Sequence, residues 1–180
     1  MSKKTLLNSK DIEIILHRLA CQLIENHNDF SNTVLIGLQP RGSYLANRLS
    51  DLLKNKYQVK GVQLGLLDIT FYRDDFRRRD APLEANTTHV DFIIENKNVV
   101  IIDDVLFSGR TIRAALDALG EIGRPRTVQL AALVDRGHRE LPIKADFVGK
   151  NLPTAKAQTV RVLLGEIDGR DEVSIEGESN

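Results

Sequence analysis

The sequence is poor in cysteine and has no long apolar run, and each shortage excludes a class of protein. Cys21 is the single cysteine among 180 residues, so the chain has no internal disulfide and no zinc site built from several cysteines. No apolar run is long enough to span a bilayer, and no apolar signal core follows the first lysines. We therefore expect a cytoplasmic protein with no membrane partner.

Charge of neither sign dominates, and aromatic residues are scarce. The chain has 25 Lys and Arg against 25 Asp and Glu, so its formal net charge is zero. Such a balance gives no global reason to bind nucleic acid, and an RNA site has to come from a local basic patch. Tryptophan is absent and aromatics make up 5%, which limits base stacking. The hydrophobic fraction of 42% is that of a globular protein, and we expect residues 1–180 to form a single domain.

Short apolar runs bounded by polar residues predict the strands. Such runs are typical of strands that are buried in a sheet. Strands are predicted over residues 34–38, 61–72, 99–102 and 127–134, with shorter candidates at residues 147–148 and 159–164.

Apolar residues recur at helical spacing in three stretches, residues 12–23, 45–53 and 112–119. Asn8 or Ser9 can cap the first helix, and Gly120 can end the third. Strands that alternate with helices form βαβ units, which predict an α/β fold with a mostly parallel central sheet flanked by helices. The highly charged residues 73–84 predict an exposed hairpin or loop.

Three polar turns that contain glycine follow predicted strands, at residues 39–43, 103–111 and 135–139. Ligands of parallel α/β sheets bind outside the carboxyl ends of the strands. We therefore expect these turns to form three walls of one site.

The turn at residues 103–111 has the features of a phosphate-binding loop. It leads from a buried strand through Asp103 and Asp104 and the sequence Phe-Ser-Gly-Arg-Thr into a helix. A helix N-terminus presents unpaired backbone N–H groups, and Gly109 lets the backbone approach an anion. Two adjacent carboxylates repel phosphate, so they suit ribose hydroxyls or a hydrated magnesium ion. An Asp-Asp pair alone would favour an acidic strand end that only caps the helix; the complete string favours the functional interpretation.

The turn at residues 39–43 resembles a pyrophosphate clamp in its chemistry. Arg41 offers planar, multidentate donors, and Gly42 exposes the N–H of its neighbour. By itself this turn is also compatible with an ordinary surface arginine.

Residues 99–111 resemble the phosphoribosyl pyrophosphate (PRPP) motif of type I phosphoribosyltransferases. Residues 133–146 (LVDRGHRELPIKAD), 149–154 (GKNLPT) and 67–75 (LDITFYRDD) narrow the resemblance to the pyrimidine-operon regulator family (PyrR). The similarity extends from the first helix to about Ile175. It implies a type I phosphoribosyltransferase fold with a flexible β-hairpin and a small hood.

The resemblance also implies an activity and its residues. Members of the family are uracil phosphoribosyltransferases, which make UMP and pyrophosphate from uracil and PRPP, with Mg²⁺ held through PRPP and waters. Carried over by position, the catalytic residues are Asp103, Asp104, Arg41 and Arg73. The substrate-binding residues are Pro40, Arg41, Gly42, Asp104, Val105, Leu106, Phe107, Ser108, Gly109, Arg110, Thr111, Arg136 and Val160.

Many members of the family also sense UMP and regulate pyrimidine biosynthesis genes by binding messenger RNA, and the resemblance implies a homodimer or a higher assembly of dimers. The candidate RNA-binding residues are Arg18, His138, Arg139, Lys144, Lys150 and Lys156.

Two alternatives stay open. One is an RNA-binding attenuation regulator with little or no catalysis. The residues that argue against it are Asp103, Asp104, Arg41 and Arg73, which are all intact. Cys21 and Pro40 replace the polar or basic residue and the threonine that regulatory members tend to carry. The other alternative is a purine phosphoribosyltransferase, from which the turn beginning at Asp135 distinguishes the chain.

Overall fold

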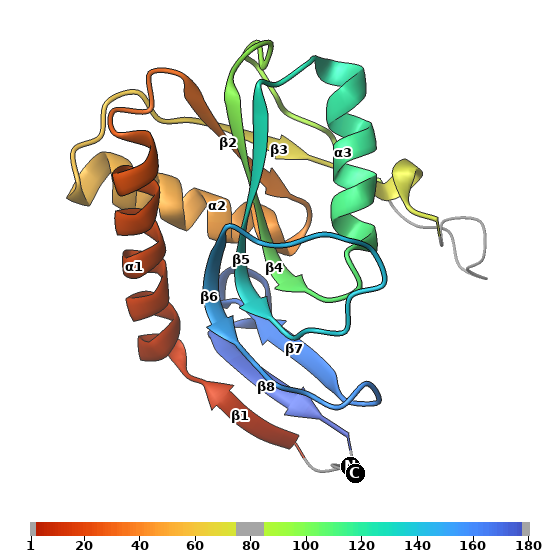
Figure 1. Ribbon diagram of the computed structural model, residues 1–180. Coiled ribbons are helices and arrows are strands. Elements are labelled where there is room, and N and C mark those ends of the chain that lie inside the picture. Colours follow the sequence, from red (N-terminus) through yellow and green to blue (C-terminus); the bar gives the residue numbers. More distant parts are fainter. Residues whose placement is uncertain (1–2, 75–84, 178–180) are drawn as a thin grey trace.

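The protein, described here from a computed structural model over residues 3–74 and 85–177, is built around a five-stranded parallel sheet. The strand order is β3-β2-β4-β5-β6, and all neighbours pair in parallel (Figure 1). This architecture confirms the predicted α/β fold with a parallel central sheet. The strands are β2 (Thr33–Leu38), β3 (Gln63–Leu67), β4 (Asn98–Leu106), β5 (Thr127–Asp135) and β6 (Phe147–Asn151).

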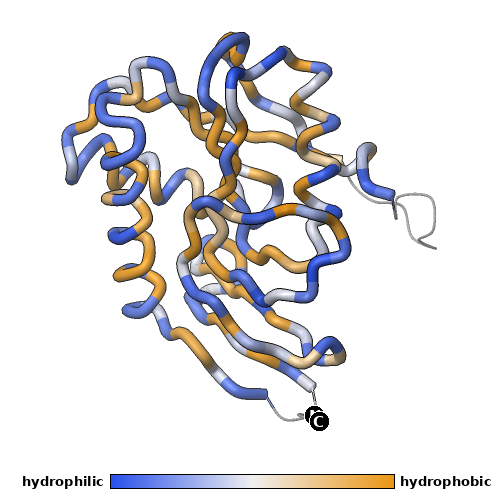
Figure 2. Tube along the Cα trace, in the orientation of Figure 1, coloured by the Kyte–Doolittle hydropathy of each residue, from blue (hydrophilic) through white to orange (hydrophobic). Residues whose placement is uncertain are grey.

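Helices cover both faces of this sheet, and each face has its own core. In β4, Val100 and Ile102 pack in the core under α1 and α2, whereas Val99 and Ile101 pack in the core under α3. Burial on both faces explains why these strands are apolar without alternation. Figure 2 shows the hydrophobic residues concentrated along the central strands. The helices are α1 (Ser9–His27), α2 (Arg41–Asp51), which continues into a π-helical turn (Leu52–Lys56), and α3 (Arg110–Ile122).

A second, antiparallel sheet forms a small hood next to the main sheet. Its strand order is β1-β8-β7, so the two ends of the described chain lie side by side. The sequence predicts β7 but not β1 and β8, which are mostly polar and have too few apolar residues to form a recognisable strand pattern. The elements of the hood are β1 (Lys3–Leu7), β7 (Thr159–Leu163), the short helix α4 (Gly165–Asp168) and β8 (Glu172–Glu176).

Several predicted boundaries need correction. The strand predicted over residues 61–72 is too long, because β3 ends at Leu67 and Thr70–Tyr72 form a 3₁₀ turn. Gly120 lies inside α3, and the helix ends at Gly123, whose N–H donates to the carbonyl of Leu119 at 3.1 Å. One glycine in an exposed helix costs only about 1 kcal/mol, which the packing of α3 offsets.

Two further findings concern the helix start and the predicted hairpin. Asn8 is the N-cap of α1; its side chain accepts from the N–H of Asp11 at 3.1 Å, and the Asp11 carboxylate accepts from the N–H of Asn8 at 2.9 Å.

Apart from Arg73 and Asp74, the hairpin predicted over residues 73–84 lies outside the described residues. Among the described helices, none combines the length and the apolar character needed to cross a bilayer.

Candidate active site

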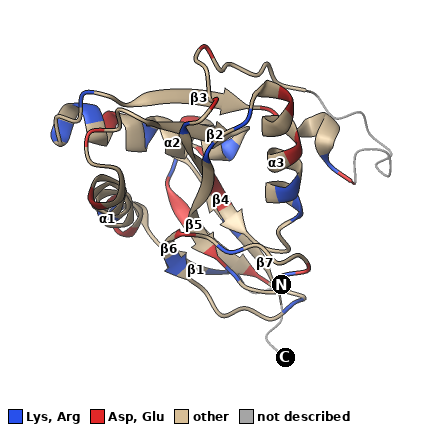
Figure 3. Cartoon of the chain, turned by 45° about the horizontal axis from the view of Figure 1, so that its top comes forward, with Lys and Arg blue, Asp and Glu red and all other residues tan. Residues whose placement is uncertain are grey.

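The three predicted turns meet at the carboxyl edge of the parallel sheet. They follow β2, β4 and β5, which are neighbours in the strand order. β4 extends through Leu106, so the two adjacent aspartates belong to the end of the strand and not to a turn. Figure 3 shows acidic residues on the central strands, while most other charged residues lie at the periphery.

A cavity of about 230 Å³ lies where β4 leads into α3. Residues 105–112 line it continuously, together with Asp103, Arg73 and Asp74. The structure therefore brings the predicted phosphate loop together with one aspartate and with the first residue of the predicted hairpin.

Gly109 gives this loop its shape. Its φ of +92° lies in the left-handed region, and it is the N-cap of α3. A Cβ at this position would also touch Ile143 at 3.3 Å and Leu141 at 3.4 Å. Gly109 has no side chain to cap α3, and within the described residues only the N–H of Arg110 has a nearby side-chain acceptor, the hydroxyl of Ser108 at 3.4 Å. The positive end of the helix dipole and the next N–H groups therefore face the cavity without a side-chain cap.

Asp103 and Asp104 are a buried and a partly buried carboxylate that accept from backbone N–H groups and feel the charges of Arg73 and Arg41. Asp103 is 7% exposed; its Oδ1 accepts from the N–H of Asp104 at 3.0 Å, and Asp104 Oδ1 accepts from the N–H of Val105 at 2.8 Å. Burial raises the pKa of Asp103 well above its usual range, and the charge of Asp104 adds to this; Arg73 acts in the opposite direction. Burial also raises the pKa of Asp104, against the N–H of Val105 and the charge of Arg41. Both carboxylates are thus poorly solvated and would gain from a hydroxyl donor or a cation.

Because the pKa of Asp103 is raised in the folded protein, its ionised form lowers the free energy of unfolding. We therefore expect Asp103→Asn to stabilise the protein at high pH. Between the usual pKa of 3.8 and the raised one, the folded state binds more protons than the unfolded state. The free energy of unfolding of the wild type therefore falls as the pH rises through this window. Asparagine keeps the acceptor for the N–H of Asp104 without the charge.

The measurement is the melting temperature of both proteins as a function of pH. The advantage of the variant should be larger near pH 8 than near pH 4, with about 2–4 °C for each kcal/mol gained. A variant that melts below the wild type near pH 8 would contradict the buried, raised-pKa description of Asp103.

The predicted pyrophosphate turn starts α2 and packs closely on β4. Arg41 is the first residue of α2, after a cis peptide bond between Gln39 and Pro40. A Cβ on Gly42 would lie 2.5 Å from the carbonyl oxygen of Ile102, directly before the two aspartates on β4. Glycine at this position therefore lets the turn approach the acids.

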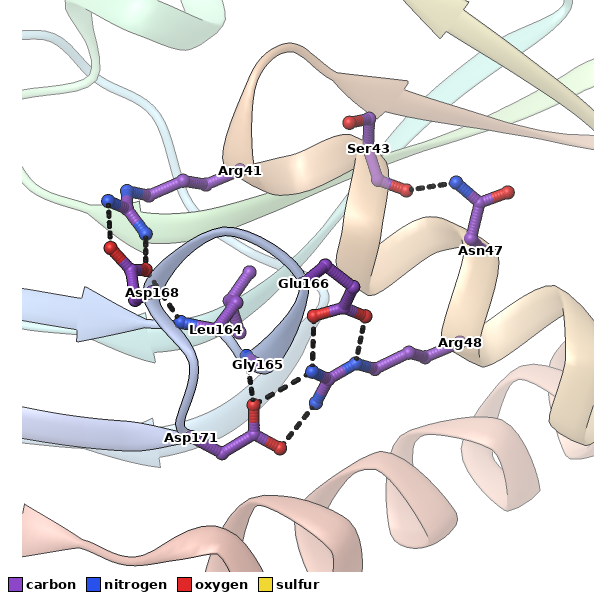
Figure 4. A network of polar contacts seen from close by, with 9 residues as sticks. All are labelled: Arg41, Ser43, Asn47, Arg48, Leu164, Gly165, Glu166, Asp168 and Asp171. Carbon is purple, nitrogen blue, oxygen red and sulfur yellow. Dashed lines mark hydrogen bonds and ion pairs between the residues drawn. The ribbon is translucent and has the colours of Figure 1, made fainter.

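Arg41 forms an ion pair that the sequence did not predict. Its Nη1 and Nη2 donate to the carboxylate of Asp168 in the hood at 2.6 and 3.3 Å (Figure 4). The two residues are far apart in the sequence, and the acidic character of residues 162–180 was the only signal of such a partner.

The third turn forms a wall against the phosphate loop. Arg136, only 6% exposed, stacks on the ring of Phe107 at 4.1 Å and donates to the carbonyl of Ala155 at 3.2 Å. Burial lowers the pKa of Arg136, and its Nε has no acceptor among the described residues. His138 packs edge-on against the same ring at 6.3 Å. Val160 on β7 is partly buried and packs on the core under α1 and α2.

The candidate RNA-binding residues fall into two groups. Arg18 donates to the carbonyls of Val148 and Gly149, and His138 bonds to a main-chain carbonyl through Nε2 at 2.6 Å. Arg139 donates to the carbonyls of Phe107 at 2.9 Å and of Ile143 at 3.0 Å, and to the carboxylate of Asp135 at 2.5 Å. These side chains therefore hold the fold together at least in part. The remaining candidates, Lys144, Lys150 and Lys156, are exposed, and their side-chain ammonium groups bond to no described residue.

Comparison with known proteins agrees with this geometry. The family model "Phosphoribosyl transferase domain" matches residues 2–164. Among solved structures, a hypoxanthine phosphoribosyltransferase from Staphylococcus aureus has a TM-score of 0.68 at 21% identity, over 94% of this chain and 90% of that one. A hypoxanthine phosphoribosyltransferase from Trypanosoma cruzi, in complex with the product IMP, has a TM-score of 0.65 at 19% identity, over 84% and 77%. Identities this low establish the fold alone.

Curated relatives are considerably more similar. The "Bifunctional protein PyrR" of Streptomyces coelicolor is 53% identical over 94% of this chain and 88% of its own length. The protein of the same name from Leuconostoc citreum is 49% identical over 97% of this chain and 99% of its own length. Similarity at this level, over nearly the full length of both proteins, means that the chain belongs to the PyrR family of phosphoribosyltransferase-domain proteins.

Proposed function

We propose that the protein is a uracil phosphoribosyltransferase, which converts uracil and PRPP to UMP and pyrophosphate. The observation that carries this proposal is the cavity lined by residues 105–112, which lies at the N-terminus of α3 next to Asp103 and Arg73. The membership in a family named for bifunctional PyrR proteins supports the same activity.

The proposed mechanism assigns a task to each group of the site. Breaking the bond between the sugar and pyrophosphate builds positive charge on the ribose and negative charge on the leaving group. Asp103 and Asp104 fix the ribose hydroxyls and favour the developing positive charge. Arg41, Arg73 and backbone N–H groups stabilise pyrophosphate, while the first turn of α3 binds the 5′-phosphate. A ring nitrogen of uracil forms the new bond to the sugar carbon as the bond to pyrophosphate breaks, and the proton of that nitrogen is released.

Magnesium fits this site as a partner of the substrate. The described residues contain no group of three or more His, Cys, Asp or Glu side chains that would form a metal cage. Mg²⁺ usually keeps several waters and binds together with substrate phosphates, and Asp103 and Asp104 would accept hydrogen bonds from those waters. When bound with PRPP, it would neutralise charge on the pyrophosphate.

The proposal includes a second function, UMP-sensing regulation of pyrimidine biosynthesis genes through mRNA binding. The printed name of the relatives, which calls them bifunctional, supports it. Lys144, Lys150 and Lys156 are the candidates whose side chains remain exposed. Binding of a pyrimidine-operon leader RNA, measured with and without UMP, tests this function; no binding in either condition would contradict it. Assembly as a homodimer, or as a higher assembly of dimers, stays a prediction.

The decisive test of catalysis compares two bases. Purified protein is incubated with PRPP, Mg²⁺ and labelled uracil, and in parallel with hypoxanthine, and nucleotide and pyrophosphate are measured. We expect UMP and pyrophosphate in equal amounts from uracil and no nucleotide from hypoxanthine. Turnover of hypoxanthine alone would favour a purine enzyme. Absence of turnover with either base, together with measurable UMP binding, would favour the regulator with little catalysis.

A further inference from the structure

Two arginines on one face of α2 hold the hood in place. Arg41 and Arg48 are two helical turns apart, so their side chains point in the same direction, toward residues 164–171 (Figure 4). Arg48 donates to Glu166 at 2.6 and 2.8 Å and to Asp171 at 2.7 and 2.8 Å. The helix that begins with the predicted pyrophosphate ligand is therefore also the helix that carries the hood.

The two arginines differ in how many guanidinium nitrogens and N–H groups form hydrogen bonds with the hood. Arg48 engages Nε and both terminal nitrogens, and its two acidic partners raise its pKa. This arrangement is an anchor with little capacity for a further ligand. Arg41 gives only two hydrogen bonds, both to Asp168, and a guanidinium has five N–H groups. Within the described residues, three N–H groups of Arg41 thus remain for an anion.

Asp168 is also held by hydrogen bonds that do not involve Arg41. Its Oδ2 accepts from the backbone N–H of Leu164 at 2.8 Å as well as from Arg41 at 2.6 Å. Its own backbone N–H donates to the carbonyl of Leu164 at 2.7 Å, which closes the turn of α4. A carboxylate fixed in this way can dictate the orientation of a flexible arginine, as supporting hydrogen bonds do for ligands in other sites.

Asp104 is a second acid whose charge acts on Arg41, although the structure has no direct hydrogen bond between the two residues. Without Asp168, the guanidinium would turn toward Asp104. Such a pair would occupy both the carboxylate proposed for the ribose and the arginine proposed for pyrophosphate.

We propose that Asp168 is the positioning residue for Arg41: by holding the guanidinium at the hood, it directs the remaining N–H groups toward pyrophosphate and keeps Arg41 away from Asp104. This inference rests on the proposed function, in which Arg41 binds the pyrophosphate of PRPP. It also joins the hood to the pyrophosphate turn, because the same hood segment is anchored to α2 through Arg48.

The test is a double-mutant cycle on the full chain, with kcat/KM for PRPP as the readout. Asp168→Asn should lower kcat/KM for PRPP about tenfold, as expected for the loss of one charge-assisted hydrogen bond. The KM for uracil should change less than about twofold. In an Arg41→Ala background, Asp168→Asn should have almost no further effect, because its role is exerted through Arg41. Glu166→Gln is the matched control; it removes one acid of the Arg48 anchor and should leave kcat/KM for PRPP unchanged.

Two results would overturn the positioning role while leaving the enzyme intact. One is an unchanged kcat/KM for PRPP in folded Asp168→Asn; the other is an equal loss in the wild-type and the Arg41→Ala background, which would indicate a general structural effect. Should Asp168→Asn fail to fold, Asp168→Glu, which keeps the charge on a longer side chain, is measured in the same cycle with the same criteria. Absence of UMP formation by the wild type is a separate outcome, which would overturn the proposed function itself.

Discussion

The Asp104→Asn variant is expected to form UMP about 10²–10³-fold more slowly than the wild type, a loss typical of removing one preorganised group from a transition state. Asp104 lies at the end of β4, next to the cavity and close to Arg41. Its negative charge is needed to bind the ribose hydroxyls and to favour positive charge on the sugar. Asparagine has nearly the same shape and can still accept from the N–H of Val105, so the fold should be retained. The measurement is kcat at saturating PRPP and uracil.

Asp117→Asn is the matched control for this change. Asp117 lies on α3, its side chain is 52% exposed, and it pairs with Arg113 at 2.8 Å one helical turn away. An exposed pair of this kind contributes little to stability. We expect turnover within about twofold of the wild type, in line with the small worth of such a pair. Near-wild-type turnover in a folded Asp104→Asn variant would rule out the role assigned to Asp104.

Gly42→Ala is expected to lower both stability and turnover. The added Cβ would lie 2.5 Å from the carbonyl oxygen of Ile102 and 3.2 Å from the Cα of Asp103. Both are backbone atoms of a central strand that is paired on both edges, so neither can give way cheaply. Overpacking of this kind costs about 1–3 kcal/mol. The start of α2 would move away from β4, and Arg41 would move with it.

A second glycine-to-alanine change separates this clash from a general effect of alanine. A Cβ on Gly120 would meet nothing within 4 Å, and the residue lies inside α3. Gly120→Ala should therefore stabilise the protein by about 0.5–1 kcal/mol, through helix propensity. Urea unfolding and turnover of both variants are compared. Wild-type turnover in Gly42→Ala would show that the pyrophosphate turn does not need its close approach to β4.

The site was predictable where it depends on local sequence. Residues 99–102 are four β-branched residues in a row, followed by two acids, a glycine and a helical pattern, and each feature has a separate physical meaning. Because neighbouring parallel strands end at one edge, the meeting of the three turns also followed from the alternation of strands and helices.

The parts that escaped prediction depend on contacts between distant segments. β1 and β8 pair with each other across nearly the whole chain, and neither has a strong apolar pattern of its own. The pairing of Arg41 with Asp168 and the packing of Arg136 on Phe107 likewise require the fold to be known. Arg18 stays a candidate for RNA binding, but its hydrogen bonds to the carbonyls of β6 also require the fold to be known, because a basic side chain on a helix gives no indication of them.

A crystal structure with UMP tests the assignment of residues 103–111 most directly. We predict that the 5′-phosphate lies at the start of α3, within hydrogen-bonding distance of the backbone N–H groups of residues 107–111. We predict further that the ribose hydroxyls contact Asp103 or Asp104 and that the base lies toward Arg136. A phosphate bound away from the start of α3, with the two aspartates free of the ribose, would contradict the assignment.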